Sequence, residues 1–102
     1  MDIHYEYNNI AFVWDAEKAR NNRIKHQGIL FENAVEAFFD PFFIFFDASR
    51  NFEHRDAIIG KTTSNHLLFV VHVQLADDQI RIISARKATG DEKRLYYENQ
   101  RP

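Results

Sequence analysis

Cysteine is absent from this chain of 102 residues, so neither disulfide bonds nor thiolate metal sites can form. Glycine and proline are scarce, at three and two copies, and no stretch resembles a linker, a repeat or a low-complexity segment. No apolar run is longer than that of residues 42–46, which is far too short to span a membrane. The N-terminus also lacks the basic segment and the long apolar run of a signal peptide. We therefore expect a cytoplasmic protein.

The chain is rich in apolar residues, with a hydrophobic content of 45% and an aromatic content of 15%, which predict an ordered protein. Its length suits one domain over residues 1–102 with a single, modest core. A net charge of −2 argues against a generic, strongly basic nucleic-acid binder. Residues 15–27 and 81–102 are nevertheless both net basic, whereas residues 28–60 are net acidic. The two basic segments form one positive surface only if the fold brings them together; otherwise they are ordinary solvated faces.

The first part of the chain predicts a strand followed by two helices. Asn8 and Asn9 suit a turn before a strand over residues 10–14. Asp15 is the expected N-cap of a helix that Gly28 ends. The apolar residues expected on the inward face of this helix are Ala16, Ala19 and Ile24. A second helix is predicted from an apolar stripe at helical spacing, ended by Asp40-Pro41: Phe31, Ala34, Val35 and Phe38.

The rest of the chain predicts four strands in a meander and a final helix. The strands are expected over residues 42–46, 55–62, 66–75 and 79–84, and consecutive hairpins imply antiparallel pairing. Thr89 and Glu92 form a capping box that starts the last helix. The aromatic run over residues 42–46 is either a central strand covered on both faces or an exposed strand that meets a partner or a second copy. The sequence therefore predicts an α+β domain with about four to five antiparallel strands, two N-terminal helices and one C-terminal helix.

Cations are concentrated where the last strand meets the last helix, over residues 81–97. Arg81, Arg86 and Lys87 precede a helix N-terminus, which itself favours anions, so this junction could hold a phosphate. This segment includes the run ISARKAT (83–89). In order along residues 12–97, this run and other short motifs resemble the BrnT family of bacterial toxins: Phe12-Val13-Trp14-Asp15 with Lys18, Lys25-His26-Gly28-Ile29, Phe31-Glu32-Ala34, Phe39-Asp40-Pro41, Glu53-Arg55, Ile59-Gly60 and Leu68-Val70-Val71.

The resemblance implies a RelE-like fold and a ribonuclease activity. It implies the toxin of a type II toxin–antitoxin pair, which cuts single-stranded RNA such as mRNA and thereby arrests translation and growth. A BrnA-like antitoxin would neutralise the toxin and would provide its only contact with operator DNA. The sequence leaves two assemblies open, a homodimer and a toxin–antitoxin heterotetramer. Residues 1–11 resemble an N-terminal extension of the family domain. The alternative is a non-catalytic binding module that acts as a corepressor with a DNA-binding antitoxin.

Metal-independent RNA cleavage needs a base for the ribose 2′-OH, an acid for the leaving 5′ oxygen and cations for the phosphate charge. Histidine suits the first two roles and arginine the third. The candidate catalytic residues are Arg81, Arg86, His26, Lys25, Glu53, His54 and Arg55. Candidates for contacting RNA are Lys87, Trp14 and Tyr97, the two aromatic residues by stacking on bases. We expect no cofactor and find no metal-ligand spacing among the histidines.

Several of these residues have an equally simple structural explanation. Trp14 is better suited to the core than to base stacking. Tyr96 and Tyr97 point about 100° apart on a helix, so at least one of them is expected to pack inward. Glu53 and Arg55 are two residues apart and could simply pair with each other. His72, inside an apolar strand, is expected to be a buried histidine with a hydrogen-bond partner.

Overall fold

The computed structural model describes residues 1–100 and contains nine helices and strands within them. In chain order they are β1 (Asp2–Tyr7), β2 (Ile10–Asp15), α1 (Ala16–Lys25), α2 (Phe31–Ala37), β3 (Ile44–Asp47), β4 (Asp56–Lys61), β5 (Leu67–Ala76), β6 (Gln79–Lys87) and α3 (Gly90–Glu98). Arg101, which belongs to the basic C-terminal segment of the sequence, lies outside the described residues. Over residues 1–100, no helix combines the length and the apolar character needed to cross a membrane.

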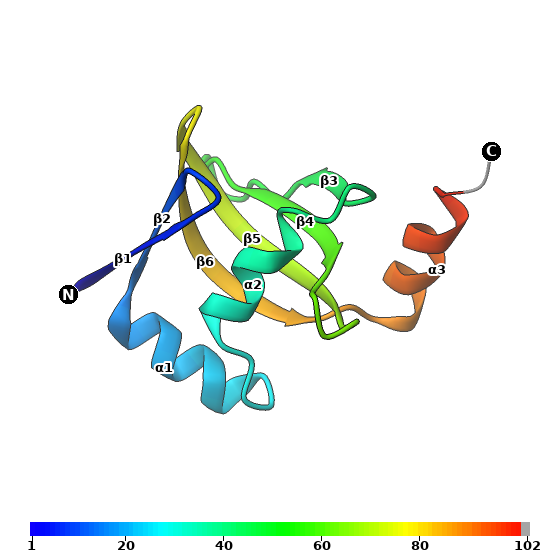
Figure 1. Ribbon diagram of the computed structural model, residues 1–102, viewed down its shortest axis with the longest axis horizontal. Coiled ribbons are helices and arrows are strands. Elements are labelled where there is room, and N and C mark those ends of the chain that lie inside the picture. The colour runs from blue at the N-terminus through cyan, green and yellow to red at the C-terminus, as the bar shows by residue number, and fades with distance from the viewer. Residues whose placement is uncertain (101–102) are drawn as a thin grey trace.

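The six strands form one mixed sheet in the order β1-β2-β6-β5-β4-β3 (Figure 1). Four neighbouring pairs are antiparallel, but β2 and β6 run parallel, from Ala11 opposite Gln79 to Val13 opposite Arg81. The α+β class and the three helices are therefore as predicted, whereas four to five strands and purely antiparallel pairing were wrong. The parallel pair arises because α1 and α2 lie between β2 and the meander and carry the chain back across the sheet.

The sixth strand comes from residues 1–11, which the sequence predicted to be an N-terminal extension. Its side chains alternate between exposed and half-buried, and β1 pairs along its full length with β2 across the Asn8-Asn9 turn. Both asparagines have positive φ, 49° and 67°, as a two-residue hairpin with right-handed strand twist requires. Residues 2–7 thus form an edge of the sheet.

Helices cover the two faces of the sheet unequally. On one face, α1 and α2 pack over the main core, which includes Phe12, Val70 and Ile82. Strand alternation places Ile59 and Phe69 on the opposite face, where they pack with Tyr96 of α3 in a smaller cluster. Figure 1 shows α3 at one end of the sheet, away from α1 and α2. Part of the second face is consequently left without a helix above it.

Strand β3 lies at the second edge of the sheet, so the first of the two interpretations of residues 42–46, a central strand covered on both faces, is wrong. Phe42 and Phe43 precede the strand in a turn and are 55% and 44% exposed, and Phe45 is 57% exposed. Central position belongs instead to β5, between β4 and β6, as its continuous apolar run predicted. The exposed aromatic residues fit the other interpretation, a face available to a partner.

Helix α1 is attached to the sheet through a buried polar side chain. Asp15 caps the helix by accepting from the Lys18 N–H at 3.0 Å, as predicted. The predicted apolar face is wrong for Ile24, which is 79% exposed. Asn22 is buried instead: its amide nitrogen donates to the Ala85 carbonyl at 2.9 Å and its amide oxygen accepts from the Ala85 N–H at 3.0 Å. Asn22 therefore makes the hydrogen bonds to Ala85 that a neighbouring strand would otherwise make, because the pairing of β2 with β6 ends before this residue.

Candidate active site

A groove of about 630 Å³ lies on the face of the sheet that α1 and α2 do not cover. Strands β5 and β6 contribute its sheet side, and the loop between β3 and β4 contributes the rest. We call it the sheet groove and define it by Ser49, Glu53, Arg55, Phe69, Ser84 and Arg86. Pairing across β5 and β6 sets Phe69 beside Arg86 and Val71 beside Ser84, which places these side chains on one face.

Arg86 is held in a fixed orientation within the sheet groove. Its two terminal nitrogens donate to the two carboxylate oxygens of Glu92 at 2.7 and 2.9 Å, and Nη1 also donates to the Lys87 carbonyl at 3.2 Å. The guanidinium carbon lies 4.2 Å from the centre of the Phe69 ring. Hydrogen bonding to Glu92 raises the pKa of Arg86, and the same contact lowers the pKa of Glu92.

Arg86 retains hydrogen-bonding capacity despite these contacts. Of the five N–H donors of an arginine, three are engaged by Glu92 and Lys87 within residues 1–100, which leaves two for a ligand. Glu92 also completes the predicted capping box, because it accepts from the Thr89 N–H at 2.8 Å while Thr89 accepts from the Glu92 N–H at 3.2 Å. One carboxylate thus fixes both the start of α3 and the position of Arg86.

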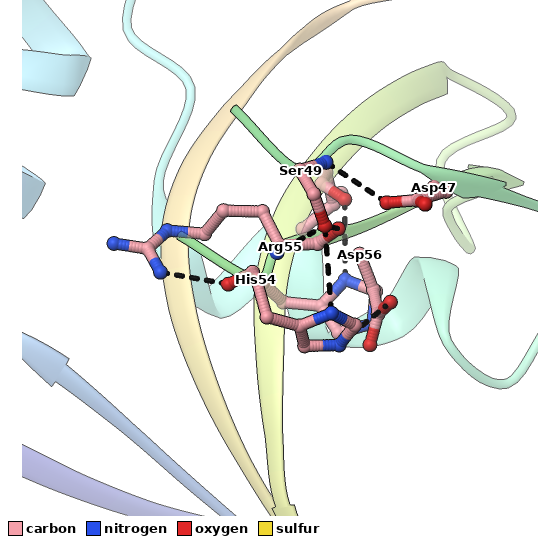
Figure 2. A network of polar contacts seen from close by, with 7 residues as sticks. Asp47, Ser49, His54, Arg55 and Asp56 are labelled. Atoms are coloured by element: carbon pink, nitrogen blue, oxygen red, sulfur yellow. Dashed lines mark hydrogen bonds and ion pairs between the residues drawn. The ribbon is translucent and has the colours of Figure 1, made fainter. Parts of the chain in front are cut away.

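Arg55 is a second groove arginine that is oriented by its neighbours. Its Nη2 donates to Glu53 at 2.9 Å, which confirms the predicted pairing of these two residues, and its Nη1 donates to the His54 carbonyl at 2.8 Å. The backbone of Arg55 is bound to the Ser49 hydroxyl, which accepts from the Arg55 N–H at 3.0 Å. Figure 2 shows the Arg55 side chain extending away from the His54 ring and Asp56.

The end of α1 brings His26 towards the same part of the sheet. Burial lowers the pKa of His26, and the positive charges of Lys25 and Arg86 lower it further. Two hydrogen bonds join Asn22 of α1 to Ala85, the residue before Arg86, and therefore hold the end of α1 close to this part of β6. The two net-basic segments of the sequence therefore do meet, at Asn22 and Ala85. Lys25 is exposed in the last turn of α1.

Arg81 lies in a different place from Arg86. Five residues separate them along β6, which corresponds to roughly 16 Å of extended chain. Arg81 forms a bidentate pair with Asp2 of β1, at 2.8 and 3.3 Å, which raises the pKa of the arginine and lowers that of the aspartate. It lines a smaller pocket of about 180 Å³ with His4 and Leu75. The two strongest candidates from the sequence thus belong to separate pockets.

The three candidate RNA-contacting residues also lie apart from the sheet groove. Trp14 is only 2% exposed and packs against Tyr5 and Phe31, so its predicted role in base stacking is wrong: its rings are inside the core. Lys87 and Tyr97 line a pocket of about 200 Å³ beside α3. Tyr96 is buried and Tyr97 is 48% exposed, as their angular separation predicted.

His54 and His72 lie on either side of a buried carboxylate. His54 is exposed, and its Nε2 is 3.2 Å from Oδ1 of Asp56, whose side chain is 11% exposed. His72 is buried, as predicted, with Nδ1 3.3 Å from the Val70 carbonyl. Burial lowers the pKa of His72, although the Val70 carbonyl and the charge of Asp56 oppose this shift.

Sequence reasoning missed four residues that shape the site: Asn22, Ser49, Phe69 and Ser84. An asparagine in a helix and a serine in a polar loop carry no local signal of such a role. Phe69 belongs to an apolar run that indicates only a central strand. The signal available for Ser84 was its position two residues before Arg86, which places both side chains on the same face of a regular strand.

Comparison with known proteins identifies the family. A solved structure with the same fold is the ribonuclease toxin BrnT of Brucella abortus, determined at 1.1 Å; it is 22% identical, with a TM-score of 0.51, over 74% of this chain and 92% of that one. A search of curated protein sequences gives no match. The model of the family described as "Ribonuclease toxin, BrnT, of type II toxin-antitoxin system" matches residues 14–92. The chain therefore belongs to the BrnT family of type II toxin–antitoxin systems.

Proposed function

We propose that this protein is a metal-independent endoribonuclease that cuts single-stranded RNA in the sheet groove and so inhibits translation and growth. The observation that carries the proposal is the pair of oriented arginines in one open groove. Arg55 and Arg86 are each held by a carboxylate, and Arg86 keeps two donors for a ligand. A planar arginine with free donors binds phosphate oxygens in pairs, and preorganised cations stabilise the charge of a phosphorane transition state.

The reaction begins with attack of the ribose 2′ oxygen on the adjacent phosphorus. A base must remove the 2′-OH proton, and His26 and Glu53 are the two candidates near Arg86. The lowered pKa of His26 favours its neutral form, which is the form that accepts a proton. Arg86 and Arg55 would bind the non-bridging phosphate oxygens, and exposed Lys25 would add to the positive potential.

The proposed partner is a BrnA-like antitoxin, through which the toxin would contact operator DNA. Membership of a type II toxin–antitoxin family supports an antitoxin partner in general. The exposed edge of β3 and the aromatic side chains of Phe42, Phe43 and Phe45 supply a surface suited to protein contact.

The test is cleavage of a labelled, unstructured RNA by purified protein freed of antitoxin, in excess EDTA. Arg86→Ala is compared with Arg81→Ala, which removes the same charge from the same strand outside the sheet groove. We expect wild type and Arg81→Ala to cut and Arg86→Ala to be slowed about 100-fold or more. Urea unfolding of each variant separates loss of chemistry from loss of folding, because Arg86 also anchors α3.

A corepressor without catalytic activity is the second candidate. It is favoured by the fact that both groove arginines already bind glutamates, which neutralises part of the charge a phosphate needs. Folded wild-type protein that leaves the RNA intact yet binds the antitoxin would support this candidate and refute the ribonuclease. If Arg81→Ala instead is the inactive variant, the reaction belongs to the pocket beside Asp2 and not to the sheet groove.

A further inference from the structure

We propose that Ser49, His54 and Asp56 form a proton relay that delivers a proton to the leaving 5′ oxygen of RNA in the sheet groove. This inference rests on the proposed ribonuclease function and assigns the acid that the reaction needs. Ser49 would be the catalytic residue, because it lines the sheet groove and carries the hydroxyl that contacts His54. His54 and Asp56 would be positioning residues that act through Ser49.

The three side chains form a continuous chain of polar contacts (Figure 2). Oγ of Ser49 lies 3.4 Å from Nδ1 of His54, and Nε2 of the same ring lies 3.2 Å from Oδ1 of Asp56. The side chain of Asp56 is largely buried, whereas the side chain of His54 is 66% exposed. A carboxylate fixed in the protein therefore orients an imidazole that solvent can reprotonate, and the imidazole contacts a hydroxyl in the groove.

The hydrogen bonds of Ser49 suit the transfer of a proton outward. A hydroxyl accepts two hydrogen bonds and donates one. When His54 is protonated, both of its ring nitrogens donate, one to Asp56 and one to Ser49. Oγ then accepts from His54 and from the Arg55 N–H at 3.0 Å. Its own hydrogen has the Arg55 carbonyl at 3.3 Å and the nearby Asp47 carboxylate as acceptors, and a substrate oxygen would take their place.

Charged groups on the neighbouring strands also face His54. Asp56 of β4 accepts a hydrogen bond from its ring. Hydrogen bonds from Ser49 are the main cause that lowers the pKa of Asp47, and the positive charge of His54 lowers it further. His72 of β5 is a neighbour that carries the same charge as His54 when both are protonated. Burial lowers the pKa of His72, and the positive charge of His54 lowers it further. Two carboxylates and one buried imidazole thus surround the ring, together with Arg55 next to it in the chain.

The chemical step balances within these groups. The 2′ oxygen loses its proton to the base and forms a bond to phosphorus as the bond from phosphorus to the 5′ oxygen breaks. The leaving oxygen takes the hydrogen of Ser49, and Ser49 takes the Nδ1 proton of His54. The products are a 2′,3′-cyclic phosphate and a 5′-hydroxyl. His54 is left neutral, and it regains a proton from water because its ring is exposed.

The experiment compares two RNA substrates that differ at one atom, the bridging 5′ oxygen or a sulfur in its place. A thiolate leaves without protonation, so the sulfur substrate makes a general acid unnecessary. Ser49→Ala and His54→Gln should cut the oxygen substrate about 100-fold more slowly than wild type, the usual contribution of a general acid. Both should cut the sulfur substrate at the wild-type rate. Asp56→Asn should show the same pattern, with a smaller loss.

The control is Ser64→Ala, which removes a hydroxyl from an exposed turn outside the sheet groove. It should match wild type on both substrates. Equal rates for wild type, Ser49→Ala and His54→Gln would overturn the relay, and so would an equal loss on both substrates, which marks a structural role. Wild-type protein that is folded but cuts neither substrate would overturn the ribonuclease function and the relay with it.

Discussion

Replacing Asn22 by alanine should destabilise this protein more than its position on a surface helix suggests. Strand β2 pairs with β6 only at residues 79–81, so the backbone of Ala85 has no strand partner on that side. The Asn22 side chain supplies both missing hydrogen bonds, at 2.9 and 3.0 Å. Alanine cannot make either bond, and Ala85 is completely buried.

The expected loss follows from the two backbone groups left without partners. A buried donor or acceptor without a partner costs about 1–3 kcal/mol, so two cost about 2–6 kcal/mol. Water entering the space of the lost amide offsets part of this, and we expect a loss of about 3 kcal/mol. That is a large fraction of the roughly 5–15 kcal/mol that stabilises a typical domain. The corresponding fall in the unfolding midpoint is about 12 °C or more.

The assay is urea unfolding followed by circular dichroism, with the free energy obtained by linear extrapolation. Asn21→Ala is a matched control, because Asn21 is the same residue type, one position earlier in α1, and exposed. The control should change the free energy of unfolding by less than about 0.5 kcal/mol. A loss below about 1 kcal/mol for Asn22→Ala would refute the claim that this side chain completes the edge of β6.

Three further predictions concern other contacts. Gly60→Ala should cost about 1–3 kcal/mol in unfolding free energy, because the added methyl would overlap the backbone carbonyl of Ala37. Tyr96→Phe should cost about 1–3 kcal/mol in the same assay, because its hydroxyl donates to buried Asp40. The folded pKa of His72 lies below its unfolded value, so this residue should reduce stability as the pH falls below about 6.5. His72→Leu should therefore flatten the dependence of unfolding free energy on pH between 7.5 and 5.5.

Each of these predictions has a control and a contradicting result. Gly90→Ala should be nearly neutral because nothing lies within 4 Å of the added atom, and an equal cost at both glycines would contradict the clash. Tyr97→Phe should leave stability unchanged, and a Tyr96→Phe variant as stable as wild type would contradict the bond to Asp40. His66→Leu should keep the wild-type pH dependence, and an unchanged slope for His72→Leu would contradict the burial effect.

Local patterns were sufficient to predict the three helices, the N-caps of two of them and the central strand. The Asp15 cap and the Thr89–Glu92 capping box were predictable because each depends on residues within one turn of a helix. The central position of β5 was predictable because a strand covered on both faces needs apolar residues throughout. Ordered motifs along residues 12–97 also identified the family, which the match over residues 14–92 confirms.

The tertiary structure decided how distant segments meet. Parallel pairing of β2 with β6 and the edge position of β3 depend on strand order, which short-range periodicity does not encode. Trp14 is in the core and Arg81 pairs with Asp2 because the N-terminal strand lies beside β2. The sheet groove is formed by a loop and by side chains of β5 and β6. The pairing register of these two strands decides which of their side chains lie side by side in the groove. The sequence by itself determined the family and the kinds of residue available for chemistry, and long-range pairing decided which of them stand together.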